Sequence, residues 1–147
     1  MTVLAILTVL VLIALPDYLN TILPEHRVRA AARDVMTDMR YARMRGVSRN
    51  LEYRIVFSPD SNSYVIQAGN RSSGSNTWTQ EGPTRDLTDP GNKCFHKDVT
   101  IDAGTTTQPI LYRPTGTVSP APTVNLSHPK TKTFTVSGSI AGRVELN

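Results

Sequence analysis

The chain has 147 residues, of which 39% are hydrophobic and 19% charged, and its formal net charge is +4. This length accommodates one domain and a further segment, and the composition is that of a globular protein. Cys94 is the only cysteine, which excludes an intramolecular disulfide. Cys94 is then either a buried small side chain or the site of an intermolecular disulfide.

Residues 1–15 contain no charged side chain, and Pro16 and Asp17 close this apolar segment. As an α-helix it would measure roughly 22 Å, against about 30 Å for the hydrocarbon core of a bilayer. It could be the apolar part of a signal peptide, a core helix, or a membrane-spanning helix whose start is missing from this chain. We favour the truncated spanning helix, because no basic residue precedes the run and no small-residue cleavage site follows it. Its expected packing residues are Val3, Leu4, Leu7, Leu10, Val11, Leu15 and Pro16.

Two prolines, Pro16 and Pro24, bracket a predicted break at residues 16–24. A proline in a helix interior costs about 3 kcal/mol because it removes a backbone hydrogen bond and clashes with the preceding turn. The break is expected either as a kinked or unwound segment, or as a loop between two helices.

Residues 25–50 show the spacing of an amphipathic helix. Apolar or small residues recur at steps of three and four and predict one buried stripe: Val28, Ala31, Ala32, Val35, Met39, Ala42 and Gly46. The other faces carry seven arginines and three acidic residues, a net charge of +4 that equals the net charge of the whole chain. We therefore predict that the charge of the protein is concentrated on this helix.

The residues after 50 have the patterns of short strands. Leu51, Tyr53, Ile55 and Phe57 alternate with polar or smaller residues, including Glu52, and a turn at 58–62 leads into a returning strand at 64–68. The polar stretch 69–93 is predicted to be a long loop, anchored by Trp78 to the domain or to a neighbouring subunit. Proline-separated apolar runs predict one further strand within 94–102 and others at 110–112, 123–126, 132–136 and 140–146, with a hairpin connection at 127–130.

These elements predict an α+β fold, in which a long N-terminal hydrophobic helix packs on a small antiparallel β-sandwich or sheet domain. The predicted division places the helical part at 1–50 and the β-rich head at 51–147.

The sequence lacks the motifs of catalysis and cofactor binding. It has no phosphate-binding loop, no zinc-ligand motif and no nucleophile elbow, and its three histidines are far apart in the sequence. We therefore predict no enzyme activity, no cofactor, no metal and no small-molecule substrate.

Several short sequence segments, in their order along the chain, resemble the type IV pilin-like proteins, and more specifically the GspH/FimT-type pseudopilins. They are residues 14–18, 29–34, 42–50, 110–117 and 142–144. The resemblance implies a structural subunit of a type IV pilus-like or type II secretion-like filament, assembled through its N-terminal hydrophobic helix. It also implies a precursor in the bacterial inner membrane and then a periplasmic or extracellular filament. A minor pseudopilin at the filament tip or in the initiation complex is the alternative.

This chain departs from the family in one respect. Members of the family carry a glutamate, preceded by a basic leader, upstream of the position that corresponds to Met1. If those residues exist in the native protein, Met1 is an internal residue. The implied partners are copies of this chain in a helical filament, or other pilin-like subunits. The candidates for charge contacts between subunits are Arg27, Arg29, Arg33, Asp34 and Arg40.

A rival of another class is a membrane-anchored domain that binds DNA or another ligand. Clustered arginines neutralise phosphates, and the candidate contacts are Arg40, Arg43, Arg45 and Arg143. We do not expect nucleic acid as a partner, because no aromatic side chains interleave with these arginines and three acidic residues dilute them.

Overall fold

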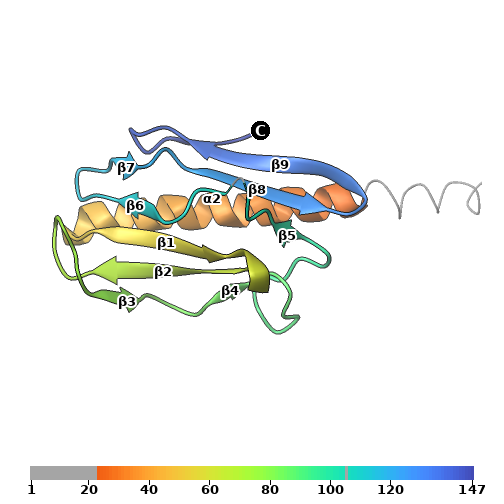
Figure 1. Ribbon diagram of the computed structural model, residues 1–147, viewed down its shortest axis with the longest axis horizontal. Helices are drawn as coiled ribbons and strands as arrows, with labels where there is room; N and C mark the ends of the chain where they lie inside the picture. Colours follow the sequence, from red (N-terminus) through yellow and green to blue (C-terminus); the bar gives the residue numbers. More distant parts are fainter. Residues whose placement is uncertain (1–22, 105) are drawn as a thin grey trace, which may run out of the picture.

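The computed structural model describes residues 23–104 and 106–147 and places one long helix against two antiparallel sheets (Figure 1). This confirms the predicted α+β fold of a helix packed on antiparallel strands. The packing residues predicted within 1–15, and Pro16, lie outside the described residues. Of the predicted break, only Leu23 and Pro24 are described, and both are helical.

Helix α2 (Leu23–Arg49) buries the stripe that its sequence predicts. Its buried residues are Pro24, Val28, Ala31, Ala32, Val35, Met39, Ala42 and Gly46. Alanine and glycine in this stripe let the helix lie close to the rest of the chain. At Gly46, an added Cβ would lie 3.3 Å from the carbonyl oxygen of Leu51, so a larger residue would press on the backbone that leads into the first strand.

The first sheet has the order β3-β2-β1-β6-β7, with β4 also paired to β2. The bounds of its strands are β1 (Tyr53–Ser58), β2 (Ser63–Gly69), β3 (Trp78–Gln80), β4 (Arg85–Asp86), β6 (Ile110–Tyr112) and β7 (Val118–Ser119). The predicted hairpin is present, with Ser58 opposite Ser63 across the short 3₁₀ turn η2 (Pro59–Ser61). Tyr53, Ile55 and Phe57 turn their side chains inward, as the alternation predicts.

The second sheet has the order β10-β9-β8-β5. Its strands are β5 (Thr100–Ile101), β8 (Thr123–His128), β9 (Thr131–Gly138) and β10 (Val144–Leu146). The predicted connection at 127–130 is the turn of the β8–β9 hairpin, where His128 pairs with Thr131. Both sheets contact α2 and pair only antiparallel strands.

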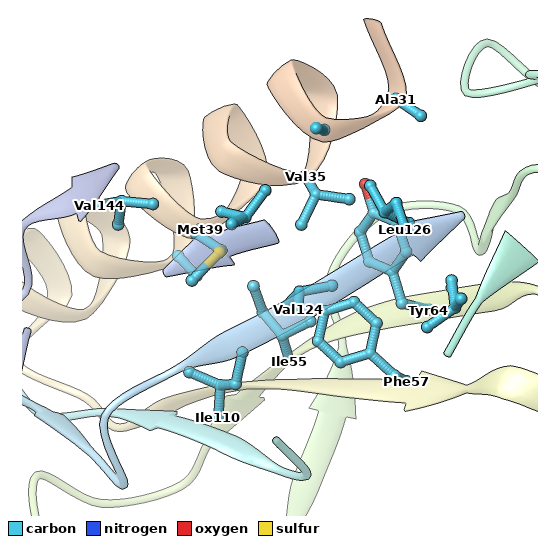
Figure 2. Packing of buried hydrophobic residues seen from close by; sticks show 14 of the residues in the cluster. Ala31, Val35, Met39, Ile55, Phe57, Tyr64, Ile110, Val124, Leu126 and Val144 are labelled. Atoms are coloured by element: carbon cyan, nitrogen blue, oxygen red, sulfur yellow. The ribbon is translucent and has the colours of Figure 1, made fainter. Parts of the chain in front are cut away.

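One core joins the helix to both sheets. Figure 2 shows Val35 and Met39 of α2 pointing toward side chains of the first sheet and of the second sheet, among them Ile55 and Val124. Each fully buried aliphatic or aromatic side chain contributes about 1.5–3 kcal/mol relative to exposure. The described part of α2 therefore shares its hydrophobic core with the β-rich head. The predicted division of the chain into a helical part at 1–50 and a head at 51–147 stays a proposal.

Two predicted boundaries are wrong, and one predicted strand is short. The stretch 69–93 contains β3 and β4, because two- and three-residue segments pair with β2. The strand predicted within 94–102 is present and comprises Thr100–Ile101, because turn hydrogen bonds and the positive φ of Asp98 (+63°) occupy the residues before it. The strand predicted at 140–146 begins at Val144, since a tight turn closes over residues 139–143.

Glu52 also departs from the simple alternation, because its side chain is only 4% exposed. Its carboxylate accepts hydrogen bonds from the backbone N–H of Ser75 (2.7 Å) and of Gly74 (3.2 Å). Burial alone would raise the pKa of Glu52, but these bonds hold the pKa below its usual value. A charged residue thus fixes the segment after β2 to the start of β1.

Candidate assembly surface

Helix α2 presents an outward face opposite its buried stripe. The exposed side chains along this face include three arginines and, toward the end of the helix, two apolar residues: Arg29, Arg33, Thr37, Arg40, Met44 and Val47. Met44 is 60% exposed and Val47 is 51% exposed, and they are two of the three exposed large apolar side chains among the described residues, the other being Ile140. This face is the candidate surface for contacts with other subunits.

The five predicted intersubunit charges differ in how they are held. Arg29 pairs with Glu25 at 3.2 Å, Asp34 lies 2.8 Å from Nε2 of His96, and Arg40 donates weakly to the carbonyl of Val144 at 3.4 Å. The side chains of the other two, Arg27 and Arg33, make no ion pair or hydrogen bond with any described residue. These two arginines are the ones whose charge is available to another molecule.

The arginines near the end of α2 have internal partners, centred on Glu81. Oε1 of Glu81 accepts hydrogen bonds from Nε of Arg45 (2.8 Å) and from the hydroxyl of Tyr41 (2.9 Å). Oε2 accepts from the hydroxyl of Tyr53 and from Arg49, which lies 3.3 Å away. Glu81 therefore ties the segment after β3 to α2 and β1.

The electrostatics of this cluster follow from those contacts. Burial alone would raise the pKa of Glu81, but the hydrogen bonds from Tyr53, Arg45 and Tyr41 outweigh it, and the pKa is lowered. Burial and the bond to Glu81 raise the pKa of Tyr53, so its hydroxyl remains a donor. Sequence reasoning missed Glu81 because it lies within the predicted loop; no local pattern marks it.

Arg43 joins two of the sequence segments that carry the family resemblance, residues 110–117 and 142–144. Its Nε donates to the carbonyl of Gly116 at 2.9 Å, and its Nη2 donates to the carbonyl of Ala141 at 3.1 Å. Gly116 and Gly142 both have a φ of +80°, which favours glycine. The segments at 110–117 and 142–144 thus form two turns that close over one helix side chain.

The four predicted nucleic-acid contacts do not form one free cluster. Arg43 and Arg45 are held by the internal contacts just described, Arg40 is exposed on α2, and Arg143 pairs with Glu145 at 2.7 Å on the surface. The expectation that nucleic acid is not a partner of this chain stays a prediction.

A cleft of about 580 Å³ opens between α2 and the segment that follows β4. Asp34, Asp38, Arg85 and Cys94 are among its lining residues. Asp38 is already engaged, since Oδ2 accepts from the hydroxyl of Tyr64 (2.8 Å) and from Nε of Arg85 (3.1 Å). Cys94 is free and half-buried, and burial raises the pKa of its thiol, so the thiol is protonated at neutral pH.

The described residues offer no arrangement for metal chemistry. Across residues 23–104 and 106–147, no group of three His, Cys, Asp or Glu side chains could hold a metal ion. His26 is exposed on α2, His96 pairs with Asp34, and His128 is buried with Nδ1 accepting from the N–H of Lys130. In the same part of the chain, no helix combines the length and the hydropathy needed to cross a bilayer.

Trp78, the expected anchor of the long loop, lies on β3 in the first sheet. The guanidinium of Arg54 lies over its ring at 4.2 Å and donates to Gln67 on the neighbouring strand at 2.7 Å. The structure therefore uses Trp78 to hold the edge strand to β1 and β2.

Comparison with known proteins gives one family and one fold. Residues 31–143 match the family described as type II transport protein GspH. The minor pseudopilin EpsH of the Vibrio cholerae type II secretion system superposes with a TM-score of 0.62 at 10% identity, covering 82% of this chain and 96% of that chain. The type IV minor pilin FimU of Pseudomonas aeruginosa gives 0.58 at 18% identity, covering 84% and 90%. No curated protein sequence matches significantly.

Proposed function

We propose, from the premise that this chain belongs to the GspH family of type II transport proteins, that it is a minor subunit that initiates a filament or lies at its tip. Members of the family are structural, non-enzymatic, pilin-like components of type II secretion and type IV pilus systems. They are found in general at the inner membrane and in the periplasm. The prediction of no enzyme activity agrees with membership of this family.

The observation that carries the proposal is the family match over residues 31–143. Two solved structures of the same fold, EpsH and FimU, are described as a minor pseudopilin and a minor pilin. A minor role therefore has more support than the role of principal filament subunit that the sequence first indicated. Whether copies of this chain also contact one another is a separate proposal, which the stoichiometry of the filament tests.

The outward face of α2 is the proposed contact with neighbouring pilin-like subunits. Met44 and Val47 would lose apolar exposure in such a contact, at about 25 cal/mol per Å² of area removed from water. Arg33 on this face, and the partly exposed Arg27 outside it, would find acidic partners on a neighbouring subunit, because they have none among the described residues of their own chain. Residues 1–15 would supply the assembly helix, with the packing residues predicted above.

Deletion of this protein in its host, with complementation, tests the proposal. An initiator predicts fewer filaments of ordinary length, because each assembly begins less often while elongation is unchanged. Complete loss of filaments with no residual assembly would instead indicate the principal subunit. An unchanged number of filaments would indicate an anchored protein outside the filament, such as a membrane-anchored ligand-binding domain.

A further inference from the structure

Three segments meet at the end of the head where the chain enters α2 from residues 1–22. In Figure 1 the turn between β8 and β9 lies beside this end of the helix. The guanidinium of Arg29 lies 5.6 Å from the centre of the Phe134 ring, which fixes β9 to the first turns of α2. Asp34 bonds His96 at 2.8 Å, which brings the segment before β5 to the same region.

These three segments gather basic side chains, which we name the basic collar. Its members come from α2, from the segment before β5 and from the β8–β9 hairpin, and they are Arg27, Arg29, Arg33, Lys97, Lys130 and Lys132. Three acidic residues lie among them, Glu25, Asp34 and Asp98, so the collar has a net charge of +3.

Internal pairing further favours an external anion at the collar. Each of its three acidic residues has a partner: Glu25 bonds Arg29, which is itself a collar member, Asp34 bonds His96, and Oδ2 of Asp98 lies 4.0 Å from Nε2 of His128. Arg27 and Arg33 have none among the described residues. At the other end of α2, by contrast, the arginines are already hydrogen-bonded: Arg43 donates to backbone carbonyl groups, and Arg45 donates to Glu81.

The position of the collar along the chain identifies the partner. Eight residue steps separate Leu15, the last residue of the apolar segment, from Leu23, and they span at most about 28 Å even when fully extended. If residues 1–15 lie in a bilayer, as the proposed function requires, the collar is the part of the head closest to the lipid headgroups.

We propose that, before assembly, the basic collar binds the phosphate groups of anionic phospholipids and holds the head against the membrane surface. This inference rests on the membrane stage of the proposed function. Each lysine or arginine near an anionic surface favours the bound state by roughly five-fold. Removal of three collar charges is therefore expected to lower the ratio of docked to undocked heads by roughly 100-fold.

Fluorescence quenching in vesicles measures this docking on the full chain. In a C94S background, Thr133→Cys places a single label on the exposed surface of β9, and a headgroup spin-labelled lipid serves as the quencher. Vesicles of phosphatidylcholine are compared with vesicles that also contain phosphatidylglycerol. The collar variant is R27Q/R33Q/K132Q, and the matched control R71Q/R113Q/R143Q removes three exposed arginines elsewhere.

We expect stronger quenching in the vesicles that contain phosphatidylglycerol than in those of phosphatidylcholine alone. High salt and the collar variant should each abolish this difference in quenching, whereas the control variant should retain it. Equal quenching in both vesicles, or an equal loss in the control, would overturn the proposal. Loss of crosslinking between copies in the collar variant, with quenching unchanged, would assign the collar to an acidic surface of another subunit and also overturn it. Flotation of the chain with the vesicles is recorded separately, because failure to float contradicts the membrane stage of the proposed function itself.

Discussion

Gly142 lies where two turns close over Arg43. A Cβ at this position would lie 2.5 Å from both Nε of Arg43 and the carbonyl oxygen of Gly116, and the φ of Gly142 is +80°. We expect G142A to lower the free energy of unfolding of the full chain in mild detergent by more than about 2 kcal/mol, because it adds steric clash to left-handed backbone strain. Urea denaturation measures the change.

Gly74 provides the matched control for that substitution. Its φ is +66°, and no atom lies within 4 Å of the position of an added Cβ. G74A therefore carries only the backbone cost of a left-handed L-residue, about 1–2 kcal/mol. If G142A and G74A destabilise the protein equally, the Arg43 turn contact contributes nothing beyond backbone conformation.

Glu81 is expected to make stability depend on pH. Its pKa in the folded state lies below the usual value of 4.5, so the stabilisation is complete above that value and is lost as the pH falls through the folded pKa. E81Q should lower the free energy of unfolding by about 1–3 kcal/mol at neutral pH, because four donors lose a charged acceptor. It should also make the decline in stability below pH 4.5 shallower.

The matched control for E81Q is E145Q, since Glu145 is exposed and pairs only with the exposed Arg143. Denaturant unfolding at a series of acidic and neutral pH values compares the two variants. Glu52, whose pKa is also lowered, should maintain part of the acid sensitivity in both. If the free energy of unfolding of E81Q falls with decreasing pH as steeply as that of the unsubstituted chain, Glu81 is not a source of the acid sensitivity.

At the scale of elements, α2 is the part that its sequence predicts best. Its buried stripe follows from local spacing alone, because one helix face repeats every three or four residues. The hairpin β1–β2 is predictable for the same reason, since alternation and a turn are local signals. The predicted boundaries fail where a strand has two or three residues, as in β3 and β4, because such a strand exists only through its partner.

The contacts of the candidate surface are harder to predict for the same physical reason. The partners of Glu81 lie on α2 and β1, tens of residues away, and nothing near Glu81 in the sequence distinguishes it from an exposed loop residue. The sequence correctly locates the charge on α2, but it does not separate the internally paired Arg45 from the unpaired Arg33.

The close approach of α2 to the sheets limits the size of the side chains that the helix can bury. Ala32 is fully buried, whereas Ala30 is partly exposed on the same helix. We expect A32L to destabilise the head by about 1–3 kcal/mol through overpacking, while A30L, the control, changes stability little. Thermal unfolding measures both, and a tolerated A32L would show that the helix can move away from the sheets at low cost.

For the whole molecule, assembly is expected to depend on the outward face of α2. Because Met44 is already 60% exposed, M44E should leave folding intact. It should reduce co-purification with other pilin-like subunits by placing a charge in an apolar contact. T79E, on the exposed edge strand β3, is the control. Equal recovery of other pilin-like subunits with M44E and with T79E would show that the outward face of α2 does not contribute to assembly.

The amount of this chain in the filament distinguishes a minor subunit from the principal one. The measurement is electron microscopy and quantitative mass spectrometry of fibres sheared from cells that produce the chain. We predict that it is present as a small fraction beside a far more abundant pilin-like subunit. Fibres built mainly of this polypeptide would contradict a minor role and identify it as the principal subunit.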